Sequence, residues 1–576
     1  MKKTSLKEWI NKFKLVLVRF TFTLIFLIGL SILCFLSIQK VKVEIRVSLW
    51  AFFVLGTLLN VAVTLYLEEF KKWHFRMLFN VLSIALLAVY CFTLPQKLFE
   101  YQNYQLIAFG AVFVLSAFFV SFLKKNNEIP FWNFSRDSII QMFIAFVFAN
   151  VLFAGLSLAL LSLDKLFGIQ INKEFYSNLA VICYVIFAPV YFLSNIPTES
   201  EKRNQKISFN KILKIFGLYI LLPILAAYTL ILYVYLFRII IKWELPNGWV
   251  STLVSVLGMV GFLCMIILYP LRRIKENKLV DVFSRYFPVL LFPLLILMSV
   301  GIFRRIGDYG LTINRCYVFI LNLWLFMISI YLLLSQSKHV KWIVISFAIV
   351  AFLSSAGPWS VYHITRHSLT IQLGKQLNDA HLLKNGKINL TKDRIIKVDS
   401  ITQNQLVGTI QYLSKTYGNE SIQKFYPISI KDKSQTEILA LTKMEHFTNY
   451  QQYTSINIKN QSLSVDTDQY HSFLYLNMFG EQKLKYEDEK VSANLENDKL
   501  IIKNKLKPMS VFSIPLKDKL KKMVEGKNTN NDYEFTKEEL TINGKNYKLI
   551  ITSVNVKFDE INDKIKITNF KGYLFY

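Results

Sequence analysis

The sequence predicts a membrane-embedded, all-α bundle of about eleven transmembrane helices, followed by a soluble α+β domain that is mostly antiparallel β. Three observations support this fold class. Hydrophobic residues make up 53% of the 576 residues and charged residues only 18%, and a soluble protein of this size has no interior that could bury so much apolar surface. The long apolar runs stop near Val361. Beyond that point charged residues and a two-residue hydrophobic period take over, which is typical of a domain that folds in water.

The composition divides the chain into two unlike regions, residues 1–361 and 362–576. The second region holds 32 Lys and Arg and 24 Asp and Glu, against 35 and 15 in the longer first region. All nine Trp and all five Cys lie in the first region. We therefore predict a polytopic transmembrane region at 1–361 and a soluble C-terminal domain at 362–576.

Eleven apolar runs in the first region are long enough to cross about 30 Å of hydrocarbon. Two of them, 77–94 and 287–303, are barely long enough, and if either fails to cross, the C-terminal domain changes sides. The runs lie at about 20–38, 49–67, 77–94, 105–123, 138–161, 175–194, 212–237, 249–269, 287–303, 317–335 and 342–360.

The distribution of basic residues predicts a cytoplasmic N-terminus. With that orientation, 24 of the 35 Lys and Arg in residues 1–361 fall in cytoplasmic segments, in agreement with the positive-inside rule. Eleven crossings then place residues 362–576 outside, so we expect a multi-pass protein of the plasma (inner) membrane with an exoplasmic C-terminal domain. Cytoplasmic loops also explain much of the net charge of +28, and we expect no nucleic-acid partner.

The C-terminal region begins with helical patterns and continues with strand patterns. Residues 362–383 and 404–417 carry apolar side chains at helical spacing, and Gly418 is placed to end the second helix. From there the hydrophobic period changes to two. The dipeptide Asn543-Gly544 is a strong hairpin signal between two such runs.

The densest polar cluster near the membrane joins the ninth and tenth spans on the predicted outer face. Its candidate ligand-binding residues are Arg304, Arg305, Asp308, Tyr309 and Arg315. Three Arg residues could bind a phosphate, a carboxylate or a lipid headgroup, with an Asp ordering them.

A purely structural role for the same segment is equally coherent. Gly307 and Gly310 permit positive φ in a tight reversal, and Thr312 could cap the next helix. Charged loops between spans are usually solvated, which favours this interpretation.

A second cluster marks the end of the last span. Gly357 and Pro358 are expected to end or kink the helix where the chain leaves the bilayer. His363 and His367 lie four residues apart and could face one metal ion, but no third ligand stands nearby, so we expect no metal site.

Several absences limit the function. No Asp, Glu, Lys or Arg lies near the middle of a predicted span, although ion-coupled transporters usually place ionisable groups there. The sequence contains no P-loop, no Gly-x-Ser-x-Gly, no His-Glu-x-x-His and no Rossmann fingerprint. We therefore expect no cofactor.

The stretch from Tyr269 to about residue 383 resembles a bacterial family known only as a domain of unknown function (number four-one-five-three). The segment Leu406–Gly418 also looks similar to that family. The resemblance implies a multi-pass envelope protein, and because the family's activity is unassigned, it implies no catalytic residues. The matching features are Tyr269-Pro270, the Pro288/Pro293 span, Arg305-x-x-Asp308-Tyr309-Gly310-Leu311-Thr312-x-x-Arg315, Trp324 and Gly357-Pro358-Trp359-Ser360.

Three functional hypotheses follow. The first is a non-enzymatic protein whose exoplasmic domain senses, binds or scaffolds an envelope component. The alternative is a lipid or anionic-solute permease that uses the helix bundle, with Arg304, Arg305 and Arg315 receiving an anionic headgroup. The third is a membrane-embedded transferase, for which Asp308 is the first acidic candidate. The expected partners are membrane lipids, and either envelope proteins or anionic lipid headgroups.

Overall fold

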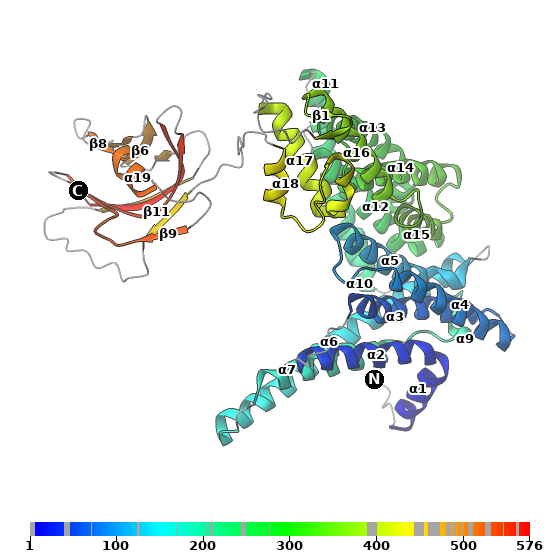
Figure 1. Cartoon of the computed structure of the whole chain (residues 1–576). Coiled ribbons are helices and arrows are strands. Elements are labelled where there is room, and N and C mark those ends of the chain that lie inside the picture. Colours follow the sequence, from blue (N-terminus) through cyan, green and yellow to red (C-terminus); the bar gives the residue numbers. More distant parts are fainter. Residues whose placement is uncertain are drawn as a thin grey trace. The chain divides into compact units, whose positions relative to one another are not determined.

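The chain folds into two compact units, Met1–Met444 and Glu445–Tyr576, called here the helical unit and the β unit. Figure 1 shows the computed structural model with the helical unit in blue to yellow and the β unit in orange to red. The structure describes residues 6–39, 46–70, 72–123, 127–169, 171–203, 205–207, 211–242, 249–275, 277–388, 400–442, 454–458, 473–479, 485–487, 491–496, 499–504, 511–524, 532–544, 547–559 and 564–575.

The first part of the helical unit is built from long apolar helices. Ten helices are long and apolar enough to cross a membrane within the described residues, so the chain is a multi-pass membrane protein. The helical elements are α1 (Leu6–Arg19), α2 (Thr21–Ile38), α3 (Val47–Leu67), α4 (Trp73–Phe92), α5 (Glu100–Phe119), η1 (Val120–Phe122), α6 (Glu128–Phe167), α7 (Lys173–Ala180), η2 (Val181–Phe187), α8 (Ala188–Ser194), α9 (Glu199–Lys202), α10 (Lys211–Ile215), η3 (Phe216–Leu221), α11 (Leu222–Lys242), α12 (Trp249–Arg273), α13 (Lys278–Tyr309), α14 (Ile313–Leu334) and α15 (Lys341–Ser355).

The predicted fold class is confirmed, and the structure revises which spans are marginal. The run 77–94 lies in the 20-residue α4 and the run 287–303 in the 32-residue α13, so both helices are long enough to cross. The shortest is instead the eleventh, because α15 has only 15 residues and ends at Ser355. At about 1.5 Å per residue it is roughly 22 Å long.

Although α15 is short, each of its two ends makes a hydrogen bond near one end of α5. At its start, Lys341 Nζ donates to the carbonyl of Phe122, at the end of η1, over 3.1 Å. At its other end, Gln105 Nε2 of α5 donates to the carbonyl of Ser355 over 2.9 Å. The two ends of α15 therefore lie beside Phe122 and Gln105, so the helix extends along the bundle as far as the segment between these two residues.

Two helices contain π-helical segments directly before a proline. The segment η2 (Val181–Phe187) precedes Pro189, and η3 (Phe216–Leu221) precedes Pro223. Proline has no N–H and its ring clashes with the carbonyl four residues earlier, so a widened turn at this position relieves the clash. The two spans continue through these segments.

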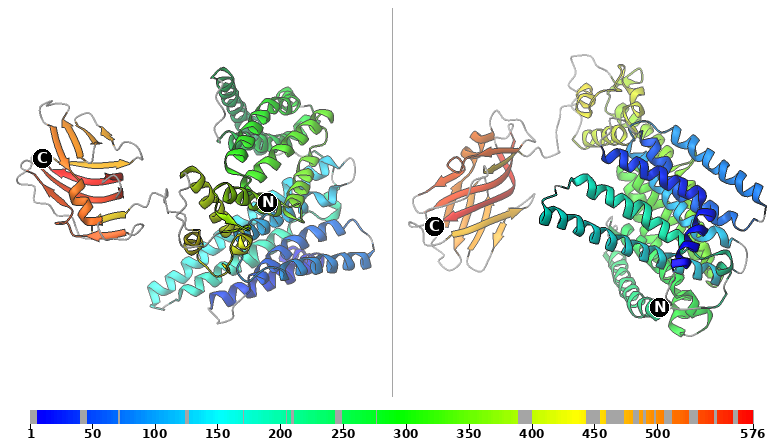
Figure 2. Two further views of the ribbon diagram at one scale, coloured as in Figure 1. Left: turned by 45° about the horizontal axis from the view of Figure 1, so that its top comes forward. Right: turned by 90° about the horizontal axis from the view of Figure 1, so that it is seen from below.

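The hairpin of α6 and α7 extends past the other helices of this unit (Figure 2). α6 is a single 40-residue helix, and its buried residues are confined to the part before Val151. Farther along, Leu158 and Leu166 are 64% and 77% exposed. So large an apolar surface is stable only in hydrocarbon, so this part of the hairpin faces lipid.

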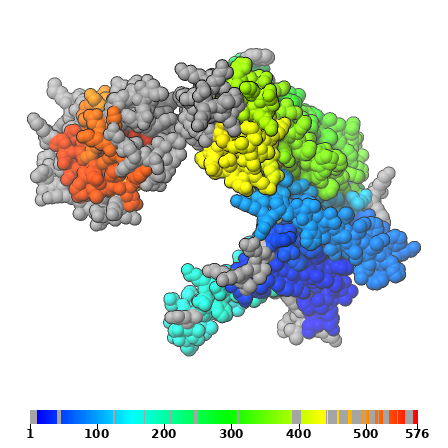
Figure 3. Space-filling view, in the orientation of Figure 1, coloured from blue at the N-terminus to red at the C-terminus, as the bar shows by residue number. Residues whose placement is uncertain are grey.

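After α15 the chain packs back onto the bundle. This segment contains α16 (Val361–Asp379), the hairpin β1–β2 (Leu383–Lys384 and Lys387–Ile388), α17 (Ser400–Tyr417), η4 (Asn419–Ser421), η5 (Gln423–Phe425) and α18 (Gln435–Leu441). Its buried side chains share one core with Ile313 and Cys316 of α14. Figure 3 shows α17 and α18 in yellow lying against the blue and green helices.

This packing extends the first compact unit to Met444, past the last apolar run. The physical reason is that α16 and α17 bury an apolar face, including Leu369, Leu373 and Leu413, against the bundle. Where the chain leaves the bilayer stays a prediction.

The β unit consists of two sheets and one helix around a single core. The six-stranded sheet has the order β4-β12-β11-β3-β9, with β10 paired to β11, and the four-stranded sheet has the order β5-β6-β7-β8. Every described pair is antiparallel except β3 with β9. The elements are β3 (Thr454–Ile458), β4 (Phe473–Phe479), β5 (Lys485–Glu487), β6 (Val491–Glu496), β7 (Lys499–Asn504), β8 (Val511–Pro515), α19 (Lys517–Val524), β9 (Asp532–Phe535), β10 (Thr541–Asn543), β11 (Lys548–Asp559) and β12 (Lys564–Phe575).

Candidate functional site

The predicted site at residues 304–315 is a helix end and a short turn. α13 continues through Tyr309, so Arg304 and Arg305 lie on its last turns and not in a loop. Gly307 also lies inside this helix, where a Cβ would meet open space. The predicted role of Gly307 in the reversal is therefore wrong, because the helix continues for two residues beyond it.

Gly310 makes the reversal. Its φ is +78°, and its N–H donates to the carbonyl of Ile306 over 2.9 Å, which ends α13. A Cβ at this position would lie 2.1 Å from Oε1 of Gln372 on α16. A guanidinium nitrogen of Arg315 donates a hydrogen bond to the carbonyl of Gly310 over 2.7 Å and so stabilises the turn.

The start of α14 is capped by a residue far away in the sequence. Thr312 occupies the N-cap position, but its side chain makes no cap hydrogen bond. Instead the N–H of Ile313 donates to the hydroxyl of Tyr412 on α17 over 3.0 Å. The expectation that Thr312 caps α14 is therefore wrong. The hydroxyl of Tyr412 accepts the hydrogen bond of a backbone N–H at the helix start, and the Thr312 side chain makes no cap bond.

The five candidate ligand-binding residues lie on the last turns of α13 and at the start of α14. Arg304 and Arg305 are exposed. The side chains of Asp308 and Tyr309 lie outside what the structure describes, so their predicted roles stay predictions.

The second predicted cluster ends α15 and begins α16. Gly357 has a φ of +80°, and Pro358 follows it. Ser360 then caps α16, accepting a hydrogen bond from the N–H of His363. His363 and His367 are both exposed, and within the described residues no group of three His, Cys, Asp or Glu could hold a metal ion.

A buried charged network joins four helical segments at the opposite end of the bundle. The carboxylate of Glu68, after α3, accepts hydrogen bonds from Arg19 (2.5 and 3.2 Å) and from Lys202 of α9. Lys202 also donates to the hydroxyl of Ser121 in η1. Burial by itself would raise the pKa of Glu68, but the hydrogen bonds and charges of Arg19 and Lys202 outweigh it and lower the pKa. Glu68 therefore stays ionised and pairs with both cations.

A second polar contact lies at the same end. The carboxylate of Glu128, the first residue of α6, accepts from the backbone N–H of Lys341 over 3.1 Å. His339 Nδ1 lies 3.3 Å from the other oxygen of this carboxylate. Because α6 and α15 both begin here, their two starts are on one face of the bundle. The sequence alone gave no pairing for these charges, since the partners are 49 to 213 residues apart.

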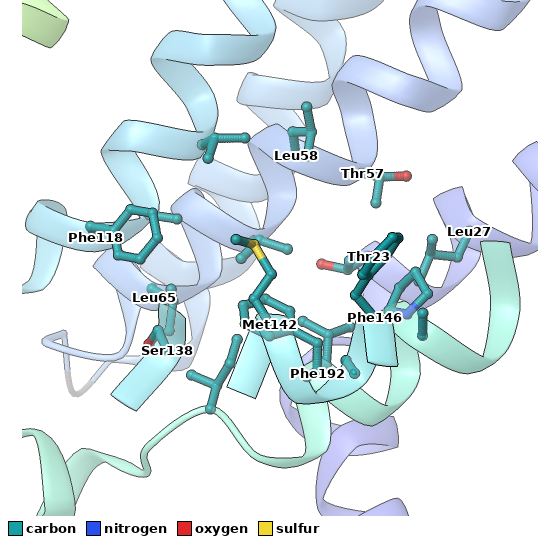
Figure 4. A pocket seen from close by; sticks show the side chains of 18 of the residues that line it. Thr23, Leu27, Thr57, Leu58, Leu65, Phe118, Ser138, Met142, Phe146 and Phe192 are labelled. Atoms are coloured by element: carbon teal, nitrogen blue, oxygen red, sulfur yellow. The ribbon is translucent and has the colours of Figure 1, made fainter. Parts of the chain in front are cut away.

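An apolar cavity of about 500 Å³ lies close to the Glu68 network, between α2, α3, α5, α6 and the η2–α8 segment. Figure 4 shows Thr23, Leu58, Phe118 and Met142 around it. Each lining residue is an ordinary side chain for a transmembrane helix, so no motif in the sequence predicted the cavity. The cavity forms only where these helices pack together.

The β unit carries exposed aromatic side chains on an edge strand. Phe473 and Tyr475 of β4 are 66% and 41% exposed. Across the β4–β12 pair, Tyr475 lies opposite Tyr573 with ring centroids 4.9 Å apart, and Phe473 lies opposite Phe575 at 6.1 Å. These four side chains, called here the aromatic row, share one face because they alternate with core residues such as Leu476.

The chain is similar to proteins of unknown function. The model of DUF4153, a domain of unknown function, matches residues 22–388, so the similarity begins far before the residues 269–383 that carry the resemblance. The uncharacterized protein PM1469 of Pasteurella multocida (strain Pm70) is 27% identical over 234 residues, which are 40% of this chain and 39% of the relative. The chain thus spans about two fifths of the length of this relative. No solved structure matches.

Proposed function

The chain belongs to the DUF4153 family, and from that premise we propose that it is a non-enzymatic protein of the bacterial plasma (inner) membrane. Its helical unit spans the membrane, and its β unit, on the exoplasmic side, binds an envelope component. This is the first of the three functions that the sequence suggested.

The aromatic row is the observation that carries this proposal. Large exposed aromatic side chains on a water-soluble unit cost solvation and mark binding surfaces. Among the described strands, β4 also lies at the edge of the six-stranded sheet, where its backbone N–H and C=O groups could pair with a partner strand. A partner that lies along β4 would therefore gain both backbone hydrogen bonds and aromatic contacts.

The two polar ends of the helical unit support the proposed orientation. The Glu68 network and the Glu128 contact join segments that the positive-inside rule places in the cytoplasm. The contact of Gln105 with Ser355 joins two segments that it places outside. With a cytoplasmic N-terminus and an odd number of crossings, of which α15 is the last, the β unit lies on the exoplasmic side.

Photocrosslinking in living cells tests the proposed binding surface. A benzophenone amino acid replaces Tyr475, and the same amino acid replaces Glu538, which is exposed in the same unit but outside the aromatic row. We expect a discrete crosslinked product from position 475 and none from position 538. Equal crosslinking at the two positions, or none at either, would argue against binding through β4.

The cavity in the helical unit is an observation that favours the permease alternative. It does not lie at the Arg cluster that the sequence indicated for this function. The cavity lies among α2, α3, α5 and α6, whereas Arg304 and Arg315 lie on α13 and α14. Transport through an Arg-lined path is therefore not supported by the described pockets. The transferase hypothesis rests on Asp308, whose side chain lies outside the described residues.

A further inference from the structure

The cavity between α2, α3, α5, α6 and α8 has the size of a ligand site. Its volume of about 500 Å³ lies within the range of roughly 300–1,000 Å³ that is usual for small-molecule pockets. Almost all of its lining is apolar, from residues such as Leu58, Phe118 and Met142. A void of this size forfeits dispersion contacts along its whole wall, so an empty state is costly.

Hydrocarbon can reach this cavity from the bilayer. On the α6 side it is lined by Met142 and Phe146, which are 50% and 58% exposed. α6 is one of the ten membrane-capable helices, so these exposed side chains face lipid. The medium next to the opening is therefore made of acyl chains.

Two buried hydroxyls line the cavity without a hydrogen-bond partner. Thr23 is 0% and Ser138 2% exposed, and neither side-chain oxygen has a partner among the described residues. In Figure 4 the hydroxyl of Thr23 points toward the space between Met142 and Leu58. Unpaired buried hydroxyls are costly, and a ligand with a polar group at this level would satisfy them.

These hydroxyls lie close to the Glu68 network along the sequence. Arg19 ends α1, and Thr23 follows four residues later in the first turn of α2. Ser138 lies one helical turn after Phe134 in α6, and the ring centroid of Phe134 lies 5.6 Å from the ammonium of Lys202. From the polar end inward, the protein therefore presents charges, then hydroxyls, then hydrocarbon side chains. Headgroup, ester carbonyls and acyl chain follow the same order in a phospholipid.

We propose that this cavity is a binding site for one acyl chain of an anionic phospholipid from the surrounding membrane. The lipid's ester carbonyl accepts hydrogen bonds from Thr23 and Ser138. Its phosphate lies toward Arg19 and Lys202, the two cations that pair with Glu68. A phospholipid fits better than water, because most of the wall offers no hydrogen bond.

A phospholipid with a photoactivatable diazirine in its acyl chain tests the site. The full chain is reconstituted in vesicles that contain this probe with either a phosphatidylglycerol or a phosphatidylcholine headgroup. Labelled residues are then located by mass spectrometry. We expect the wild type to be labelled at buried lining residues such as Leu65 and Leu193, which bulk lipid does not reach, and more strongly with the anionic headgroup.

A cavity-filling substitution and a matched control decide between specific and general lipid contact. Ala117→Phe on α5 puts a ring into the cavity, whereas Ala111→Phe changes an exposed alanine of the same helix that does not line it. We expect Ala117→Phe to lower labelling of the buried lining residues Leu65 and Leu193 by about tenfold or more, and Ala111→Phe to leave it unchanged. Equal labelling in both variants would overturn the proposal.

Thr23→Val keeps the proposal testable if Ala117→Phe does not fold. If the hydroxyl binds lipid, this nearly isosteric change lowers labelling in the cavity by several-fold and does not raise the melting temperature. If the cavity is empty and the hydroxyl unpaired, the change leaves labelling at background and stabilises the protein, because it removes an unsatisfied polar group. The second pattern contradicts lipid binding.

Discussion

The hydroxyl of Tyr412 accepts a hydrogen bond from the backbone N–H of Ile313 over 3.0 Å. The two residues are 99 positions apart. Ile313 begins α14, a membrane-capable helix, and Tyr412 belongs to α17 in the segment that follows the bundle. The bond therefore fastens this segment to a transmembrane helix at the turn of Gly310, and α17 is part of the helical unit.

Tyr412→Phe should destabilise the helical unit by about 1–2 kcal/mol. The change removes only the hydroxyl, so it leaves the N–H of Ile313 without its partner and costs more than an ordinary hydrogen bond. Thr312→Ala is the control, because the Thr312 side chain makes no cap bond, and it should cost less than about 0.5 kcal/mol. Thermal unfolding of the purified full chain in detergent measures both. Equal losses would mean that Thr312 caps α14 after all.

Gly310 and Gly307 should respond in opposite directions to alanine. Gly310→Ala meets both a φ of +78° and a Cβ position 2.1 Å from Gln372, so it should cost more than about 1 kcal/mol. Gly307→Ala falls in a helix with open space around the new methyl group, so it should be neutral or stabilise by up to about 1 kcal/mol. Unfolding of the two variants under identical conditions gives the comparison. A loss at Gly307 as large as at Gly310 would place the reversal where the sequence suggested it.

These two glycines illustrate what the sequence could and could not predict. Composition and long apolar runs predicted the membrane bundle, because crossing a bilayer demands some 20 apolar residues whatever the neighbours are. A local signal also predicted the end of α17, because Gly418 directly follows its last residue and has a positive φ. Gly357 also has a positive φ, but α15 already ends at Ser355. Gly307 carries the same signal but lies in a helix, because a glycine permits a turn without requiring one.

The remaining features depend on contacts between distant residues. The pairing of Glu68 with Arg19 and Lys202, and the cavity beside it, arise only when α2, α3, α6 and α9 pack together. Single-sequence periodicity reports which face of a helix is apolar, but not which helix covers it. For the same reason the composition gave no sign that the apolar faces of α16 and α17 pack in one core with α14 and extend the first compact unit to Met444.

Removal of the Glu68 charge should strongly destabilise the helical unit. Glu68→Gln removes the carboxylate that pairs directly with two buried cations, Arg19 and Lys202, at a cost of about 3 kcal/mol or more. Lys202→Met should cost less, because the pair of Arg19 and Glu68 survives. If Lys202→Met proved the more damaging of the two in thermal unfolding at neutral pH, Lys202 and not Glu68 would be the centre of the network.

The same network predicts the pH dependence of stability. Because the pKa of Glu68 is lowered in the folded protein, its stabilisation is fully present above the ordinary glutamate pKa of 4.5 and is lost as the pH falls through the folded value. The difference in melting temperature between the wild type and Glu68→Gln should therefore be constant near neutral pH and shrink below pH 4.5. A difference that stays constant down to acid denaturation would show that Glu68 does not stabilise the fold through its charge.

The proposed orientation requires Asn543 and Ser200 to lie on opposite sides of the membrane. Both are exposed, Asn543 at the end of β10 in the β unit and Ser200 in α9 beside the Glu68 network. Single cysteines at these positions are treated with a membrane-impermeant thiol reagent, in a background where the five native cysteines are replaced. In cells with a permeabilised outer membrane, Asn543→Cys should react at once and Ser200→Cys only after lysis. The reverse pattern would place the N-terminus outside. Reaction of both before lysis would mean that the polypeptide crosses an even number of times between them, so that α15 or another helix does not span the bilayer.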